Sequence, residues 1–155
     1  MNRLLAEARR RWGLMSPDGP RAVALHALAR RHGTPLYVYS GPLIDQRVAA
    51  LRAELPAGLS LLYALKANPH PAVVARLAPQ VDGCDVTSAG EIAVARRAGV
   101  AGAALSFAGP GKTDAELAAA IAGDALVVLE SLAEARRLAA LAAGRCRPQI
   151  GRAHV

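Results

Sequence analysis

Aromatic residues are scarce in this sequence, at 3% of 155 residues, and lysine and cysteine are rarer still. The two cysteines, Cys84 and Cys146, lie far apart, and no cysteine or histidine has metal-site spacing. We therefore expect no metal ion and a reducing, cytoplasmic compartment. No apolar run approaches the ~20 residues of a membrane helix, so we expect no membrane partner.

Lysine is nearly absent from a basic chain. The formal net charge is +7, yet of 19 basic residues only Lys66 and Lys112 are lysines. The arginines are scattered along the chain, without the clustered basic and aromatic residues of a nucleic-acid site. We therefore expect no nucleic-acid partner. With 20% charged and 53% hydrophobic residues, the composition is that of a folded chain.

From residue 59 onward, short apolar runs alternate with helical patterns. The predicted strands are residues 59–65, 83–87, 103–107 and 125–129, and the predicted helices are 71–77, 89–98, 114–122 and 132–143. Such alternation predicts an α/β fold with a parallel sheet covered by helices. The chain is too short for a complete eight-stranded barrel, which takes about 250 residues.

Three of these helices begin with the same signature, a serine or threonine followed three residues later by glutamate. The segments are Ser88–Glu91, Thr113–Glu116 and Ser131–Glu134. The hydroxyl can accept a hydrogen bond from the first turn while the glutamate reaches back to the N-cap amide. We predict a capping box at each. Upstream, we predict a helix over 21–31, a strand over 35–39 and a helix over 43–55 that ends at Pro56.

The carboxyl ends of parallel strands are where an active site is expected, and Lys66 ends the first of them. Lysine can lose its proton and become a nucleophile, whereas arginine cannot, so Lys66 is notable in an arginine-rich chain. A structural or phosphate-contacting lysine fits the position as well. Ala64 shares a face with Lys66 and leaves room for a flat ring, and Asp85 ends the next strand.

Other polar residues at these strand ends have simpler interpretations. Lys112 follows a Gly-Pro-Gly turn, and we interpret it as a loop cation. His70 lies between two prolines and is interpreted as a loop histidine. Glu91 completes a predicted capping box, and Glu130 follows the strand over 125–129.

The segment Tyr63-Ala-Leu-Lys66-Ala-Asn68-Pro69 resembles the cofactor-lysine segment of the fold-type III pyridoxal-phosphate decarboxylases, which include diaminopimelate, ornithine and arginine decarboxylases. The resemblance covers roughly residues 20–147. Four further segments agree in order and spacing, namely 34–39, 83–91, 106–112 and 129–131.

This resemblance implies pyridoxal 5'-phosphate as cofactor and decarboxylation of an amino acid substrate through a Schiff base at Lys66. It also implies that Asp85 lies beside that lysine, that Ala64 lies against the cofactor, and that Glu91 is near the site. The decarboxylases are carbon–carbon lyases, and the complete parent protein is expected to be a homodimer. Amino-acid racemases share the fold, and a non-catalytic domain that binds a ligand or a partner is the third interpretation.

The resemblance also predicts a domain organisation. Residues 1–19 are an N-terminal extension, and residues 20–58 are a helix–strand–helix lead-in whose strand would join a C-terminal β domain. Residues 59–149 would form the first half of a TIM-type (β/α)8 barrel of the alanine racemase/decarboxylase type, with about four βα units. A truncated barrel would be inactive alone. Residues 150–155 match the translation of a sequencing-library adapter, and we expect a non-native tail rather than a strand.

Overall fold

The structure is a computed structural model that describes residues 20–143 and 150–151 of a chain that divides into two units, residues 1–39 and 40–155. The extension expected over residues 1–19 lies outside the described residues. In the first unit, helix α2 spans Pro20–His32, within one residue of the prediction at each end. Gly33 ends it with a φ of +81°, a conformation that favours glycine, and its N–H donates to Ala29 O at 2.8 Å.

The strand predicted over residues 35–39 is not formed, and this prediction is wrong for the structure. Residues 36–40 have no regular secondary structure, and Tyr37 is 88% exposed. A strand is stabilised by hydrogen bonds to a neighbouring strand, and no segment of the described chain pairs with this one. Its apolar, aromatic sequence favours an extended backbone, and the partner expected for it is a C-terminal β domain, so the domain organisation stays a prediction.

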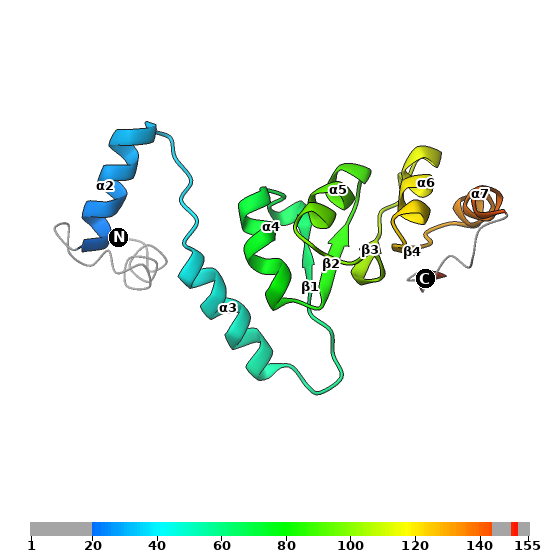
Figure 1. The fold of residues 1–155 in the computed structure, drawn as a ribbon, viewed down its shortest axis with the longest axis horizontal. Coiled ribbons are helices and arrows are strands. Elements are labelled where there is room, and N and C mark those ends of the chain that lie inside the picture. The colour runs from blue at the N-terminus through cyan, green and yellow to red at the C-terminus, as the bar shows by residue number, and fades with distance from the viewer. Residues whose placement is uncertain (1–19, 144–149, 152–155) are drawn as a thin grey trace. The chain divides into compact units, whose positions relative to one another are not determined.

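The second unit alternates strands and helices as predicted (Figure 1). Its strands form a parallel sheet in the order β1-β2-β3-β4-β5. The strands are β1 Leu62–Ala64, β2 Gly83–Val86, β3 Leu105–Phe107, β4 Leu126–Val128 and β5 Ile150–Gly151. The helices are α3 Gly41–Glu54, α4 Pro71–Leu77, α5 Ala89–Arg97, α6 Asp114–Ala122 and α7 Leu132–Ala142, with short 3-10 turns η1 Leu65–Ala67, η2 Ala78–Gln80 and η3 Gly102–Ala104.

The short strand β5 differs from the prediction for the end of the chain. Ile150 pairs with Val127 and Gly151 pairs with Val128, both in parallel. The expectation that residues from 150 onward form no strand is therefore wrong for these two. Residues 152–155 lie outside the described residues, and the non-native origin of residues 150–155 stays a prediction.

One face of the sheet carries the core. Alternate strand residues on this face are 0–1% exposed and pack against helix residues such as Val74, Leu117 and Leu138. These strand residues are Cys84, Val86, Leu105, Phe107 and Val127. Burial raises the pKa of the Cys84 thiol. The strand residues that alternate with them point to the other face, and most of these are only partly buried. The helices thus cover one face, and the other face carries Asp85 and Ser106 among apolar strand residues.

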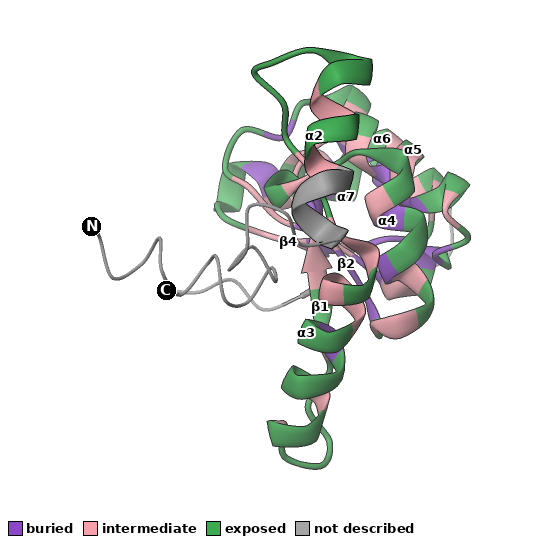
Figure 2. Ribbon diagram, turned by 90° about the vertical axis from the view of Figure 1, so that its left-hand side faces the viewer, coloured by how far each residue is buried: buried purple, intermediate pink, exposed green. Residues whose placement is uncertain are grey.

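Helix α3 is exposed along much of its length, and Val48 is its buried residue (Figure 2). Polar contacts therefore provide much of its attachment to the rest of its unit. Asp45 accepts hydrogen bonds from Arg76 at 2.5 and 2.9 Å, and Asp82 accepts from Arg52 and from the Leu61 N–H, both at 2.6 Å. The Arg52 guanidinium and the Leu61 N–H hold the pKa of the Asp82 carboxyl below its ordinary value. No helix in the described ranges is long and apolar enough to span a membrane.

Of the three predicted capping boxes, one is complete. At α6, Thr113 Oγ1 accepts from Glu116 N while Glu116 Oε2 accepts from Thr113 N at 3.0 Å. At α5 and α7 the serine caps form, but each glutamate bonds the amide one residue before the cap, so the box prediction is wrong in that half. The N-caps of these two helices are more extended, with φ of −154° and −159° against −80° at Thr113. A more extended cap presents the preceding amide to the carboxylate.

Candidate active site

Lys66 lies at the carboxyl end of β1, in the middle of the 3-10 turn η1, with an exposed side chain. The residues around it are anchored. Leu65 is fully buried in the core, and Tyr63 Oη donates to Asn68 O at 3.0 Å, which closes the turn. Asn68 Oδ1 in turn accepts from His70 N at 3.0 Å. The turn therefore presents an accessible amine on an anchored backbone.

Asp85 is held beside the strand that leads to Lys66. It pairs in register with Ala64 on one side and with Ser106 on the other. Partners in register on parallel strands share a face and lie about 4.8 Å apart. Asp85 is partly exposed, whereas its neighbours Cys84 and Val86 are buried against the helices. The structure thus places Ala64 and Asp85 together on the face opposite the helices.

Glu91 forms hydrogen bonds with the loop that follows β2. Its Oε2 accepts from Thr87 N at 2.7 Å and from Thr87 Oγ1 at 3.1 Å, while its own N–H donates to Ser88 Oγ. Within the described ranges, no hydrogen bond or ion pair joins Glu91 to Lys66 or Asp85. Glu91 therefore holds the strand-end loop beside Asp85.

Lys112 is not a loop cation, and that interpretation is corrected by the structure. It is 4% exposed, and its Nζ donates to Gly109 O at 2.7 Å and to Val128 O at 2.8 Å. Glu134 Oε1 is its ion-pair partner at 2.8 Å, without the alignment of a hydrogen bond. The scarcity of lysine that singled out Lys66 was an equally good signal for Lys112.

His70 is a helix cap as well as a loop histidine. It is the N-cap residue of α4, and its Nδ1 accepts from Ala72 N at 3.3 Å. Pro71 follows at the first helical position, where a missing N–H costs nothing. His70 therefore has a local structural role at the start of α4.

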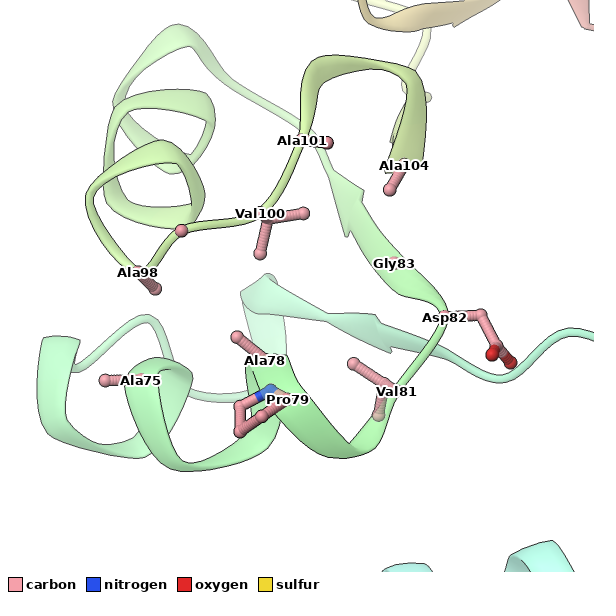
Figure 3. A pocket seen from close by; sticks show the side chains of 11 residues that line it. Ala75, Ala78, Pro79, Val81, Asp82, Gly83, Ala98, Val100, Ala101 and Ala104 are labelled. Carbon is pink, nitrogen blue, oxygen red and sulfur yellow. The ribbon is translucent and has the colours of Figure 1, made fainter.

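A cavity of about 430 Å³ lies at the opposite edge of the sheet from Lys66. Figure 3 shows that its lining side chains come from α4, from the turns before β2 and β3 and from the end of α5, and that they are mostly small and apolar. Asp82 supplies a carboxylate at its margin, and this carboxylate is already bonded to Arg52. The cavity therefore does not coincide with the strand ends that carry Lys66 and Asp85.

Comparison with known proteins identifies the family to which the chain belongs. Residues 42–151 match the family described as pyridoxal-dependent decarboxylase, pyridoxal binding domain. The diaminopimelate decarboxylase of Aquifex aeolicus is 41% identical over 105 residues, covering 68% of this chain and 25% of that protein. The L-glutamyl-[BtrI acyl-carrier protein] decarboxylase of Niallia circulans is 35% identical over 109 residues, covering 70% and 26% respectively.

The fold is shared with solved decarboxylases. The crystal structure of Helicobacter pylori diaminopimelate decarboxylase complexed with L-lysine superposes with a TM-score of 0.68 and 30% identity, covering 77% of this chain and 31% of that one. The chain spans about a quarter to a third of these relatives. Its parallel sheet and helices are the N-terminal portion of their barrel-type α/β fold. The chain belongs to the pyridoxal-dependent decarboxylase family, in the pyridoxal-binding domain.

Proposed function

We propose that the complete protein is a pyridoxal-phosphate-dependent amino-acid decarboxylase of the diaminopimelate-decarboxylase type, and that Lys66 is its cofactor lysine. The observation that carries this proposal is the exposed Lys66 amine at the carboxyl end of β1, in a chain that uses arginine at almost every other basic position. The family match over residues 42–151 includes this lysine.

The residues around Lys66 fit such a cofactor. The small side chain of Ala64 leaves space for a flat ring on the face that carries Asp85. The Asp85 carboxylate, in register with Ala64, would orient an amine held on this face. When bound, pyridoxal phosphate supplies an electron sink that allows an amino acid to lose carbon dioxide.

Each residue of the proposed site then has a distinct task. Lys66 would hold the cofactor through Nζ, and Asp85 would keep that amine oriented on the strand face. Glu91 would not contact the cofactor itself. Its hydrogen bonds with Thr87 hold the loop that directly follows β2. Lysine is suited to the covalent task because it can lose its proton, which arginine effectively does not do.

The test uses the unusual lysine content of the chain. Incubation with pyridoxal phosphate, reduction with borohydride and peptide mass mapping should place the adduct on Lys66. The variant Lys66→Arg keeps the positive charge and should lose the adduct. Lys112 is the built-in control, because it is the other lysine and is buried. An adduct on Lys112, or one that persists in Lys66→Arg at the same level, would contradict the assignment.

The proposed substrate class is an α-amino acid, as expected for a relative of diaminopimelate decarboxylase. Carbon dioxide release from a panel of amino acids by the complete protein is the direct measurement, and interconversion of enantiomers without carbon dioxide would favour the racemase alternative. We also propose that the complete protein is a homodimer, as the family resemblance implies, and that it is cytoplasmic, as its few and widely separated cysteines indicate. Light scattering on that protein would measure its mass.

A further inference from the structure

Lys112 and Glu134 are buried charges in a largely apolar core. They are 4% and 2% exposed, and among the described residues they are the polar or charged side chains that are buried. A buried ion pair loses the solvation of both charges, and replacement by apolar residues is often neutral or stabilising. Folding stability alone therefore does not explain why this pair is present.

The Lys112 ammonium joins the ends of two neighbouring strands. Its two carbonyl acceptors are Gly109, in the turn after β3, and Val128, the last residue of β4. With Glu134 as the third partner, three groups surround an ammonium that has three N–H bonds. The ring of Phe107 lies 5.5 Å from Nζ on the same side of the sheet as the core.

Two carboxylates complete the connection between these strand ends. Glu130 N donates to Glu134 Oε2 at 2.9 Å, and Gly109 N donates to Glu130 Oε1 at 2.6 Å. Gly109 therefore accepts from Lys112 and donates to Glu130, with a φ of +115° that favours glycine. The result is a closed network around the backbone of residues 109–112 and 128–130.

This network lies at the carboxyl edge of the sheet, where Lys66 follows β1 and Asp85 lies in β2. We infer that the Lys112–Glu134 pair is a positioning device, which fixes the strand-end backbone of β3 and β4 as part of the rim of the cofactor site. That this rim surrounds a cofactor rests on the proposed function. The network itself is independent of that proposal.

The test separates positioning from simple core filling. The single variant Lys112→Met leaves the Glu134 carboxylate buried without a counter-charge and should be strongly destabilised. The double variant Lys112→Met with Glu134→Leu removes both charges and should recover the thermal midpoint. The matched control is Arg76→Gln with Asp45→Asn, which removes an exposed ion pair far from the rim.

Hydrogen exchange measures the rim without any cofactor. In the folded double variant, the amide of Glu130 loses its acceptor and should exchange about tenfold faster, the change expected for one ordinary hydrogen bond. The amide of Gly109 should also exchange faster, because the turn loosens. The amides of β2 in this variant, and all amides in the control double variant, should keep wild-type exchange rates. Wild-type exchange at the rim in the double variant would overturn the inference.

A second variant keeps the inference testable if the double variant does not fold. Glu130 is exposed, so Glu130→Ala should fold and should speed exchange of the Gly109 amide alone about tenfold. No change there would also overturn the inference.

Cofactor capture should fall about tenfold in the double variant at equal stability. If wild type captures no cofactor on Lys66 but the exchange result holds, the proposed function fails and the positioning device stands.

Discussion

The close approach of β2 to the turn before β3 gives a sharp prediction at Gly83. Gly83 opens β2 and is buried, and a methyl carbon added to it would overlap Ala104 O and lie 3.0 Å from Ala104 C. Both atoms belong to the backbone, so no side-chain rotation relieves the overlap. Gly83→Ala must therefore displace the amino end of β2 from η3, and Asp85 lies two residues further along that strand.

Overpacking of this kind costs about 1–3 kcal/mol. One kcal/mol shifts the midpoint of a unit of this size by roughly 4–8 °C, so Gly83→Ala should lower it by roughly 4–24 °C. Thermal unfolding followed by circular dichroism measures the change, and urea unfolding gives the free energy.

The matched control is Gly90→Ala, because a methyl carbon there meets Ser88 Oγ at an ordinary 3.8 Å. Gly90 lies in the first turn of α5, where alanine is the better helix former, so this variant should match or exceed wild type by up to about 1 kcal/mol. A Gly83→Ala protein within about 0.5 kcal/mol of wild type, the range of ordinary surface substitutions, would refute the described packing of β2 against η3.

Two further predictions concern polar contacts. The Thr113 N–H and, after it, the Thr113 hydroxyl lower the pKa of Glu116. Thr113→Ala keeps the N–H but removes the hydroxyl that caps α6, and should cost about 0.5–2 kcal/mol in urea unfolding. An unchanged midpoint would contradict the complete capping box. Arg52 lowers the pKa of Asp82 in the folded state, so the stability from this pair is present above the ordinary aspartate pKa and is lost as the pH falls through the folded value. The urea midpoint of Asp82→Asn should therefore fall less on acidification than that of wild type, and equal falls would contradict the contact.

Local signals in the sequence predicted the helices well. The helix beginning at Pro71 and the one capped by Thr113 have the predicted bounds, because a first-turn proline and a side-chain cap act within a few residues. The predicted strands contain β1 to β4 but extend beyond them, since pairing with a neighbour decides where a strand ends, and β5 was not predicted. The strand expected over 35–39 is not formed in the described chain for the same reason, because the partner expected for it is a C-terminal β domain.

The candidate site was predictable where it depends on strand order. Parallel strands in chain order bring Ala64 and Asp85 into register, which the βα alternation already implied. The roles of the glutamates were harder to predict. Glu91 and Glu134 have the sequence spacing of capping boxes, yet both bond the residue before the cap, and the burial of Glu134 depends on Lys112 from another loop.

The two lysines of the chain show why a single residue type can serve two purposes at one edge of a sheet. An ammonium is compact and has three N–H bonds, so at Lys112 it fits among two carbonyls and a carboxylate in a buried space that a planar guanidinium would not match. At Lys66 the same group is exposed, and in the proposed function it is the amine that would hold the cofactor. Arginine lacks the compact ammonium group and effectively does not lose its proton. We therefore expect Lys66→Arg and Lys112→Arg to be poorly tolerated.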